Sequence, residues 1–98
     1  MNVNKIQQDA NLIVEIEGRL DTSTAPQLEA ELGTLDGVKE LVLDFAKLEY
    51  ISSAGLRVLL GAQKKMNVKG EMKIKNVNDT IMEVFDITGF ADILTIEK

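Results

Sequence analysis

The most informative stretch of the sequence is YISSAGLRVLL, residues 50–60. It passes from apolar residues through two serines and two small residues into a run with helical spacing. Three leucines in that run are spaced i, i+3 and i+4, so they would share one face of a helix. A serine at such a start can accept a hydrogen bond from an unpaired backbone N–H. We therefore expect a helix from Ser53 to Met66, capped by Ser52 or Ser53.

A buried strand is expected before this helix. Residues 41–45, LVLDF, form a mostly apolar run that is typical of a strand in a parallel sheet, and residues 46–50 would link it to the helix. The chain would then pass from strand to helix through a loop that carries two exposed serines. Partners of open α/β sheets usually bind at such loops, so this loop is the first candidate site.

The first third of the chain predicts two strands and a helix. Residues 3–7 and 12–17 flank a polar turn and indicate an antiparallel pair, with Gly18 ending the second strand. The residues Thr24-Ala25-Pro26-Gln27 resemble a capping box for the first helix, which Gly33 would end.

The last third alternates strand and helix. Residues 71–75 predict a strand with Met72 and Ile74 buried. A helix capped within residues 78–80 would end at Gly89, and residues 93–96 would form a last strand. The order is β-β-α-β-α-β-α-β, which predicts one α/β domain over residues 1–98 with a mixed, mostly parallel sheet.

Composition excludes several classes of protein. The 98 residues include 11 Lys and Arg against 16 Asp and Glu, a net charge of −5, which argues against binding nucleic acid or an anionic membrane. No apolar run approaches the ~20 residues of a membrane span, so we expect a cytoplasmic protein with no membrane partner. The sequence has no cysteine and no histidine, so zinc sites of the usual kind cannot form.

The sequence does not predict an enzyme. A serine hydrolase would need a G-x-S-x-G elbow and a histidine base, and neither is present. The glycine-rich motifs of nucleotide-binding enzymes are absent too. We therefore expect no catalytic residue, no cofactor and no bound metal.

Three segments together resemble one known family. Residues 51–56, ISSAGL, resemble the switch motif of the anti-sigma factor antagonists, which are bacterial members of the STAS domain family. Residues 18–21, GRLD, and residues 84–90, VFDITGF, agree with the same family in one register. The resemblance covers nearly the whole chain and implies a STAS fold with the element order given above.

The resemblance implies a phosphorylation switch at Ser53. In this family the matching serine is phosphorylated by the anti-sigma factor, which is a serine kinase. The unphosphorylated form binds that kinase and frees the sigma factor. A serine phosphatase restores the unphosphorylated form. A phosphate at a helix N-terminus is compatible with the fold, because unpaired N–H groups and the helix dipole favour negative charge there. The preceding position is usually Asp, whereas here it is Ser52, which is a second candidate for the phosphate.

The expected partner surface surrounds the two serines. The small residues of this surface would either let the backbone of a partner protein come close or pack against the sheet. Its two cationic side chains would either contact acidic residues of the partner or face solvent. The loop before the first helix is either a kinase contact, as the resemblance implies, or a capping cluster. The candidate residues are Asp21, Thr22, Ser23, Ser52, Ser53, Ala54, Gly55, Leu56, Arg57, Gly61 and Lys64. The alternative function is a STAS-like scaffold or ligand-sensing module without a phosphorylation cycle.

Overall fold

The computed structural model describes residues 1–97 as a five-stranded sheet with three α-helices and one 3₁₀ helix. The predicted fold class and element order are confirmed. The elements are β1 (Asn2–Gln8), β2 (Asn11–Leu20), α1 (Ala25–Leu32), β3 (Glu40–Ile51), α2 (Ser53–Lys69), β4 (Glu71–Lys75), α3 (Asp79–Thr88), η1 (Phe90–Asp92) and β5 (Ile96–Glu97).

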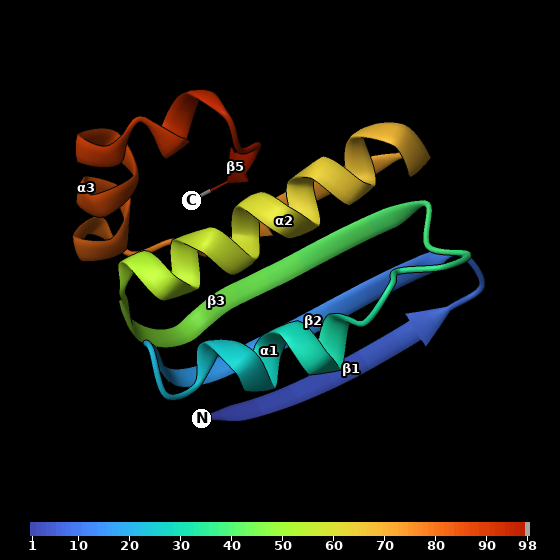
Figure 1. Cartoon of the computed structure of the whole chain (residues 1–98), viewed down its shortest axis with the longest axis horizontal. Helices are drawn as coiled ribbons and strands as arrows, with labels where there is room; N and C mark the ends of the chain where they lie inside the picture. Colours follow the sequence, from blue (N-terminus) through green and yellow to red (C-terminus); the bar gives the residue numbers. More distant parts are fainter. Residues whose placement is uncertain (98) are drawn as a thin grey trace.

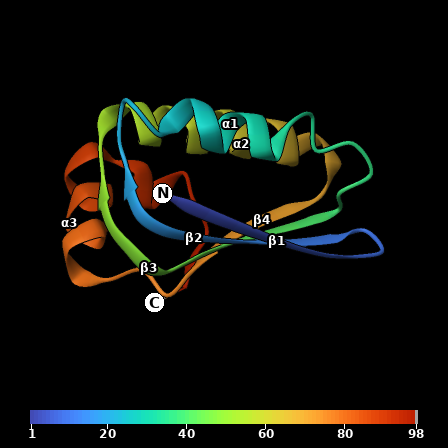
Figure 2. The ribbon, with the colours of Figure 1, turned by 90° about the horizontal axis from the view of Figure 1, so that it is seen from below.

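The sheet order is β1-β2-β3-β4-β5, with β1 antiparallel to β2 and the remaining neighbours parallel. Helices α1 and α2 lie side by side over one face of the sheet (Figures 1 and 2). Helix α3 lies at the end of the molecule where α2 begins. Each α-helix follows a strand directly in the chain, so it begins near the carboxyl end of that strand.

The core lies between the sheet and the helices. Strand β2 alternates as expected, burying Leu12, Val14 and Ile16 and exposing the residues between them. The predicted burial of Met72 and Ile74 on β4 is confirmed. The largest fully buried side chains are Phe45, Phe85, Ile16, Leu20, Leu28, Leu41, Leu43, Leu48, Leu59, Met66, Ile74 and Ile81.

Strands β2 and β3 are longer than the sequence predicts. Gly18 does not end β2, and the expected link over residues 46–50 is part of β3. The two strands stay paired to their ends because register shifts next to Gly18, which has a φ of 106°, absorb the mismatch between them. The pairing therefore reaches Leu20 and Ile51, and both strands finish at the same edge of the sheet.

The helix ends mostly follow the predictions. Gly33 and Gly89 end α1 and α3 with positive φ angles of 58° and 82°, as expected. Helix α2 continues past Met66 to Lys69, and the last strand is shorter and later than residues 93–96 because it pairs only with the end of β4. Within residues 1–97, no helix has both the length and the apolar content needed to cross a membrane.

Of two helix caps that the sequence predicts, the one before α1 differs in the structure and the one before α3 is confirmed. The Thr24–Gln27 capping box is not formed within the described chain, because the Thr24 hydroxyl oxygen accepts instead from Asp21 N–H at 2.8 Å, while the hydroxyl donates to the Arg19 carbonyl oxygen at 2.8 Å. Helix α3 is capped by Asn78, whose Oδ1 accepts from the Ile81 N–H at 2.8 Å. The Asn78 amide also donates to the Leu48 carbonyl oxygen at 3.1 Å, which ties the start of α3 to β3.

Replacing the Asn78 side chain should destabilise the protein. We expect Asn78→Ala to lower the free energy of unfolding by about 1–2 kcal/mol, because it removes a helix cap together with the bond to β3. Thr80→Ala is the matched control inside the first turn of α3 and should change it by less than about 0.5 kcal/mol. Urea denaturation of the two variants measures both effects, and equal losses would contradict the assignment of the cap.

Candidate functional site

The two serines at the β3–α2 junction have different environments. Ser53 is the first residue of α2, and its side chain is exposed. Ser52 is the N-cap residue, but its hydroxyl oxygen is buried and has no hydrogen-bond partner within residues 1–97. The expectation that a serine hydroxyl caps α2 is therefore wrong. Backbone bonds hold the junction instead: Ser52 N–H donates to the Leu20 carbonyl at 2.9 Å, and its carbonyl accepts from Leu56 N–H at 3.0 Å.

The loop after β2 lies directly beside this junction. The bond from Ser52 to Leu20 places it there, so the structure brings together two segments that the sequence separates by about thirty residues. Within the loop, the Asp21 carboxylate accepts from the Ser23 hydroxyl at 2.7 Å, from Ser23 N–H at 3.0 Å and from Thr24 N–H at 3.2 Å. The Ser23 hydroxyl is the main reason that the pKa of Asp21 lies below its ordinary value.

A shallow pocket of about 200 Å³ opens between α1 and α2 beside the junction. It brings Thr22 from the loop together with Ala54 and Arg57 from α2. Ala54 is half-buried, while Thr22 and Arg57 are exposed. The other lining residues are Ala25, Pro26, Glu29 and Val58.

Two of the residues expected to contact a partner are buried. Leu56 belongs to the core. Gly55 packs against the sheet, which is the second of the two roles predicted for the small residues. A Cβ atom at Gly55 would lie 2.7 Å from Leu20 Cγ and 2.9 Å from Ile51 Cγ1. Neither residue can touch a partner in this structure, and the buried hydroxyl oxygen of Ser52 cannot do so either. Gly55 instead lets α2 begin close to the ends of β2 and β3.

Gly61 and Lys64 lie farther along the exposed face of α2. A Cβ atom at Gly61 would meet no atom within 4 Å among residues 1–97, so this glycine leaves an open spot on the surface. Lys64 follows Ser53 by eleven residues, which is about 16 Å along a helix axis. The structure therefore does not bring Lys64 to the serine.

One side-chain pair at the site was not singled out from the sequence. The Arg19 guanidinium stacks over the Tyr50 ring at 4.3 Å from its centroid and lies 3.9 Å from the Asp21 carboxylate. Arg19 and Tyr50 are register partners at the ends of β2 and β3. These two side chains meet only because β2 and β3 pair along their full length, whereas the sequence predicts that both strands end earlier.

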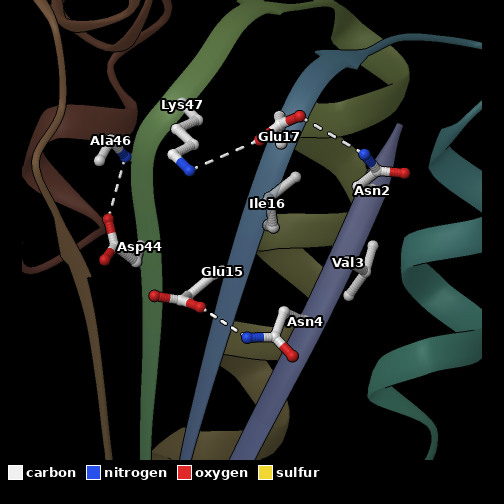
Figure 3. Close-up of a pocket in the computed structure, with 9 residues that line it drawn as sticks. All are labelled: Asn2, Val3, Asn4, Glu15, Ile16, Glu17, Asp44, Ala46 and Lys47. Atoms are coloured by element: carbon white, nitrogen blue, oxygen red, sulfur yellow. Dashed lines mark hydrogen bonds and ion pairs between the residues drawn. The ribbon is translucent and has the colours of Figure 1, made fainter.

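A second hollow, of about 250 Å³, lies on the sheet face opposite α1 and α2 (Figure 3). Its carboxylates already have partners. Glu15 accepts from Asn4 at 2.7 Å, and Glu17 lies 3.8 Å from the ammonium nitrogen of Lys47. Asp44 accepts from the backbone N–H of Ala46 and from the Asn76 side chain, both at 2.9 Å. These contacts hold strand neighbours together, so the hollow is a structural feature of the sheet.

The model of the STAS domain family matches residues 2–98. The chain belongs to the STAS domain family. A Bordetella bronchiseptica protein named as an anti-sigma factor antagonist, BtrV, is 41% identical to this STAS domain over 91 residues, which cover 90% of this chain and 78% of that protein. The anti-sigma-B factor antagonist of Staphylococcus aureus is 31% identical over 101 residues, covering 100% of this chain and 94% of the relative.

Solved structures show the same fold. The anti-sigma factor antagonist SpoIIAA in its unphosphorylated form superposes on this STAS domain with a TM-score of 0.78 at 20% identity, covering 99% of this chain and 88% of that one. The phosphorylated form of the Bacillus protein gives a TM-score of 0.76 at 20% identity, covering 99% and 92%. The predicted STAS fold is therefore confirmed.

The two glycines of α2 should respond in opposite ways to alanine. Gly55→Ala should lower the free energy of unfolding by about 1–3 kcal/mol, because the new methyl group overlaps Leu20 and Ile51 in the core. Gly61→Ala should raise it by about 0.5–1 kcal/mol, because an open helical glycine gains helix propensity. Thermal and urea denaturation measure both. A Gly55→Ala variant as stable as the parent would contradict the close packing.

The Asp21 carboxyl group offers a test of the loop. Because its pKa is lowered in the folded chain, its hydrogen bonds contribute to stability above the ordinary carboxyl pKa, and this contribution is lost as the pH falls through the lowered pKa. Ser23→Ala should raise the pKa of Asp21, since it removes the strongest of these bonds. Carbon-13 NMR titration measures the change, and Thr22→Ala is the control. An unchanged pKa in Ser23→Ala would contradict the hydrogen-bond assignment.

Proposed function

We propose that this STAS domain is an anti-sigma factor antagonist controlled by phosphorylation of Ser53. In its unphosphorylated form it binds an anti-sigma factor that is a serine kinase, and this binding frees the sigma factor. Phosphorylation ends the binding, and a serine phosphatase restores it. Such a role places the chain in the bacterial cytoplasm. Relatives at 41% and 31% identity that carry the name anti-sigma factor antagonist support the first part of this proposal.

The observation that carries the choice of residue is the contrast between the two serines. Ser53 is exposed at the first position of α2, whereas the Ser52 hydroxyl oxygen is buried. A kinase must place the acceptor oxygen in line with the terminal phosphate of ATP, so it needs a hydroxyl that it can reach. Ser53 meets this requirement without any movement of the fold, and Ser52 does not.

The chain provides only the acceptor in this reaction. The Ser53 hydroxyl oxygen forms a bond to the γ-phosphorus of ATP, the bond from that phosphorus to the bridging oxygen of ADP breaks, and the hydroxyl proton passes to a base of the kinase. Metal ions and catalytic side chains come from the kinase. This division supports a regulatory role for the STAS domain itself.

The exposed surroundings of Ser53 support a docking surface there. Asp21, Thr22 and Ser23 form the neighbouring loop, while Ala54 and Arg57 line the adjacent pocket. A phosphate carries about −1.5 to −2 charges at pH 7, so its addition would change the charge at the centre of this surface. SpoIIAA, which shares the fold, has been solved in unphosphorylated and phosphorylated forms.

Phosphate uptake by serine variants tests the proposal. The chain is incubated with ATP and the anti-sigma kinase of its own organism, and intact mass is measured. We expect the parent and Ser52→Ala to gain one phosphate and Ser53→Ala to gain none, because only the Ser53 hydroxyl is accessible. Ser53→Ala should keep its affinity for the kinase, whereas Ser53→Asp should lose about tenfold or more, the equivalent of about 1.4 kcal/mol.

The opposite outcomes separate the alternatives. Undiminished phosphate uptake by Ser53→Ala, with loss in Ser52→Ala, would move the modification to Ser52. Equal affinity for the parent, its phosphorylated form and Ser53→Asp would favour a scaffold or ligand-sensing module instead. Isothermal titration calorimetry at two salt concentrations measures these affinities, since interactions between exposed charges weaken as salt rises.

A further inference from the structure

We infer that Arg57 is the internal counter-ion of phosphorylated Ser53, and that its guanidinium binds the phosphate across one turn of α2. This inference rests on the proposed phosphorylation of Ser53 and adds a phosphate-binding residue to the switch. It assigns two states to Arg57: a free cation on the surface of the unmodified chain, and a partner of the phosphate in the modified chain.

The helix places the two residues together. Ser53 and Arg57 are four residues apart on α2, and both are exposed. Residues with this spacing are neighbours on a helix surface, with Cβ atoms about 5–6 Å apart. The Cα–Cβ bond of a helical residue also tilts toward the N-terminus, which brings the Arg57 side chain within reach of Ser53. A negative group that precedes a positive one by four residues is the favourable order, because it agrees with the helix dipole.

Arg57 is free to take this role. Within the part of the chain that the structure describes, it belongs to none of the four ion pairs. Glu29 lines the same pocket from α1, yet the two side chains form no ion pair within residues 1–97. A planar guanidinium can donate two parallel hydrogen bonds to a phosphate, which makes arginine well suited to this contact.

The other charged groups near the junction do not replace Arg57. Arg19 is engaged by the Tyr50 ring and by Asp21, and Lys64 lies about 16 Å along the helix from Ser53. Asp21 carries a negative charge on the adjacent loop and would repel a phosphate. A cation one turn along α2 offsets that repulsion.

The first turn of α2 leaves further donors for the phosphate. The first N–H groups of any α-helix have no acceptor within the helix. Ser52 does not cap α2 through its side chain in the described structure, and the first backbone bond here begins at Leu56 N–H. Phosphate oxygens can therefore accept from the first-turn backbone on one side and from Arg57 on the other.

Phosphorylation would then change the docking surface twice. It adds about −1.5 to −2 charges at Ser53, and it withdraws the positive charge of Arg57 from any acidic group of the partner. Both effects weaken the attraction for an acidic partner group, and the net charge of the Ser53–Arg57 pair would change from +1 to between about −0.5 and −1.

Phosphorus-31 NMR tests the inference on the full 98-residue chain. Phosphoserine is incorporated at position 53 during synthesis, so no kinase is needed. A nearby cation stabilises the dianion and lowers the second pKa of the phosphate, which is ordinarily about 6. We expect Arg57→Gln to raise this pKa by about 0.2–0.4, as for a pair spaced i, i+4. Arg57→Lys should raise it less, because it keeps the charge and loses the paired donors.

Lys64→Gln is the matched control, since it removes one charge from the same helix face beyond the screening distance of about 10 Å. It should change the phosphate pKa by less than about 0.1. Nitrogen-15 correlation spectra confirm that each variant is folded. Equal phosphate pKa values in Arg57→Gln and Lys64→Gln would overturn the inference. Failure of every kinase to modify Ser53 would overturn the proposed function and leave this pKa comparison valid, so the two failures are distinguishable.

Discussion

The parallel pairing of β2 with β3 is the constraint on which the site depends. Because the two strands stay paired as far as Leu20 and Ile51, both following loops begin at one edge of the sheet. The hydrogen bond from Ser52 N–H to the Leu20 carbonyl closes that edge. A slip in this pairing would separate the Asp21 loop from the start of α2, and the surface around Ser53 would no longer exist.

Close packing beneath α2 places Ser53 on the outside of the helix. Gly55 allows the first turn to lie against Leu20 and Ile51, with no room for a side chain. Once that face of the turn is buried, the helical period of about 100° per residue places Ser53 and Arg57 on the outside. The burial of one face and the exposure of the other have the same cause.

The sequence was sufficient for the strand and helix order and for the location of the site, because periodicity and glycine positions are local signals. It was insufficient for the caps. The Thr24 hydroxyl binds the Arg19 carbonyl, and the Ser52 hydroxyl is buried, and both outcomes depend on the neighbouring strand ends. Gly18 is wrongly predicted to end β2, because local propensity does not reveal a register shift between two long strands. The burial of Gly55 and Leu56 likewise follows from the sheet beneath them.

The exposed position of Ser53 has a consequence for the timing of a signal. Its modification would require no opening of the core and no exchange between two folds, since the first turn of α2 is already formed. Under the proposed cycle, the message is stored in a covalent bond and not in a conformational equilibrium. Its lifetime would then be set by the turnover of the two opposing enzymes, and thermal motion of the domain alone would not erase it.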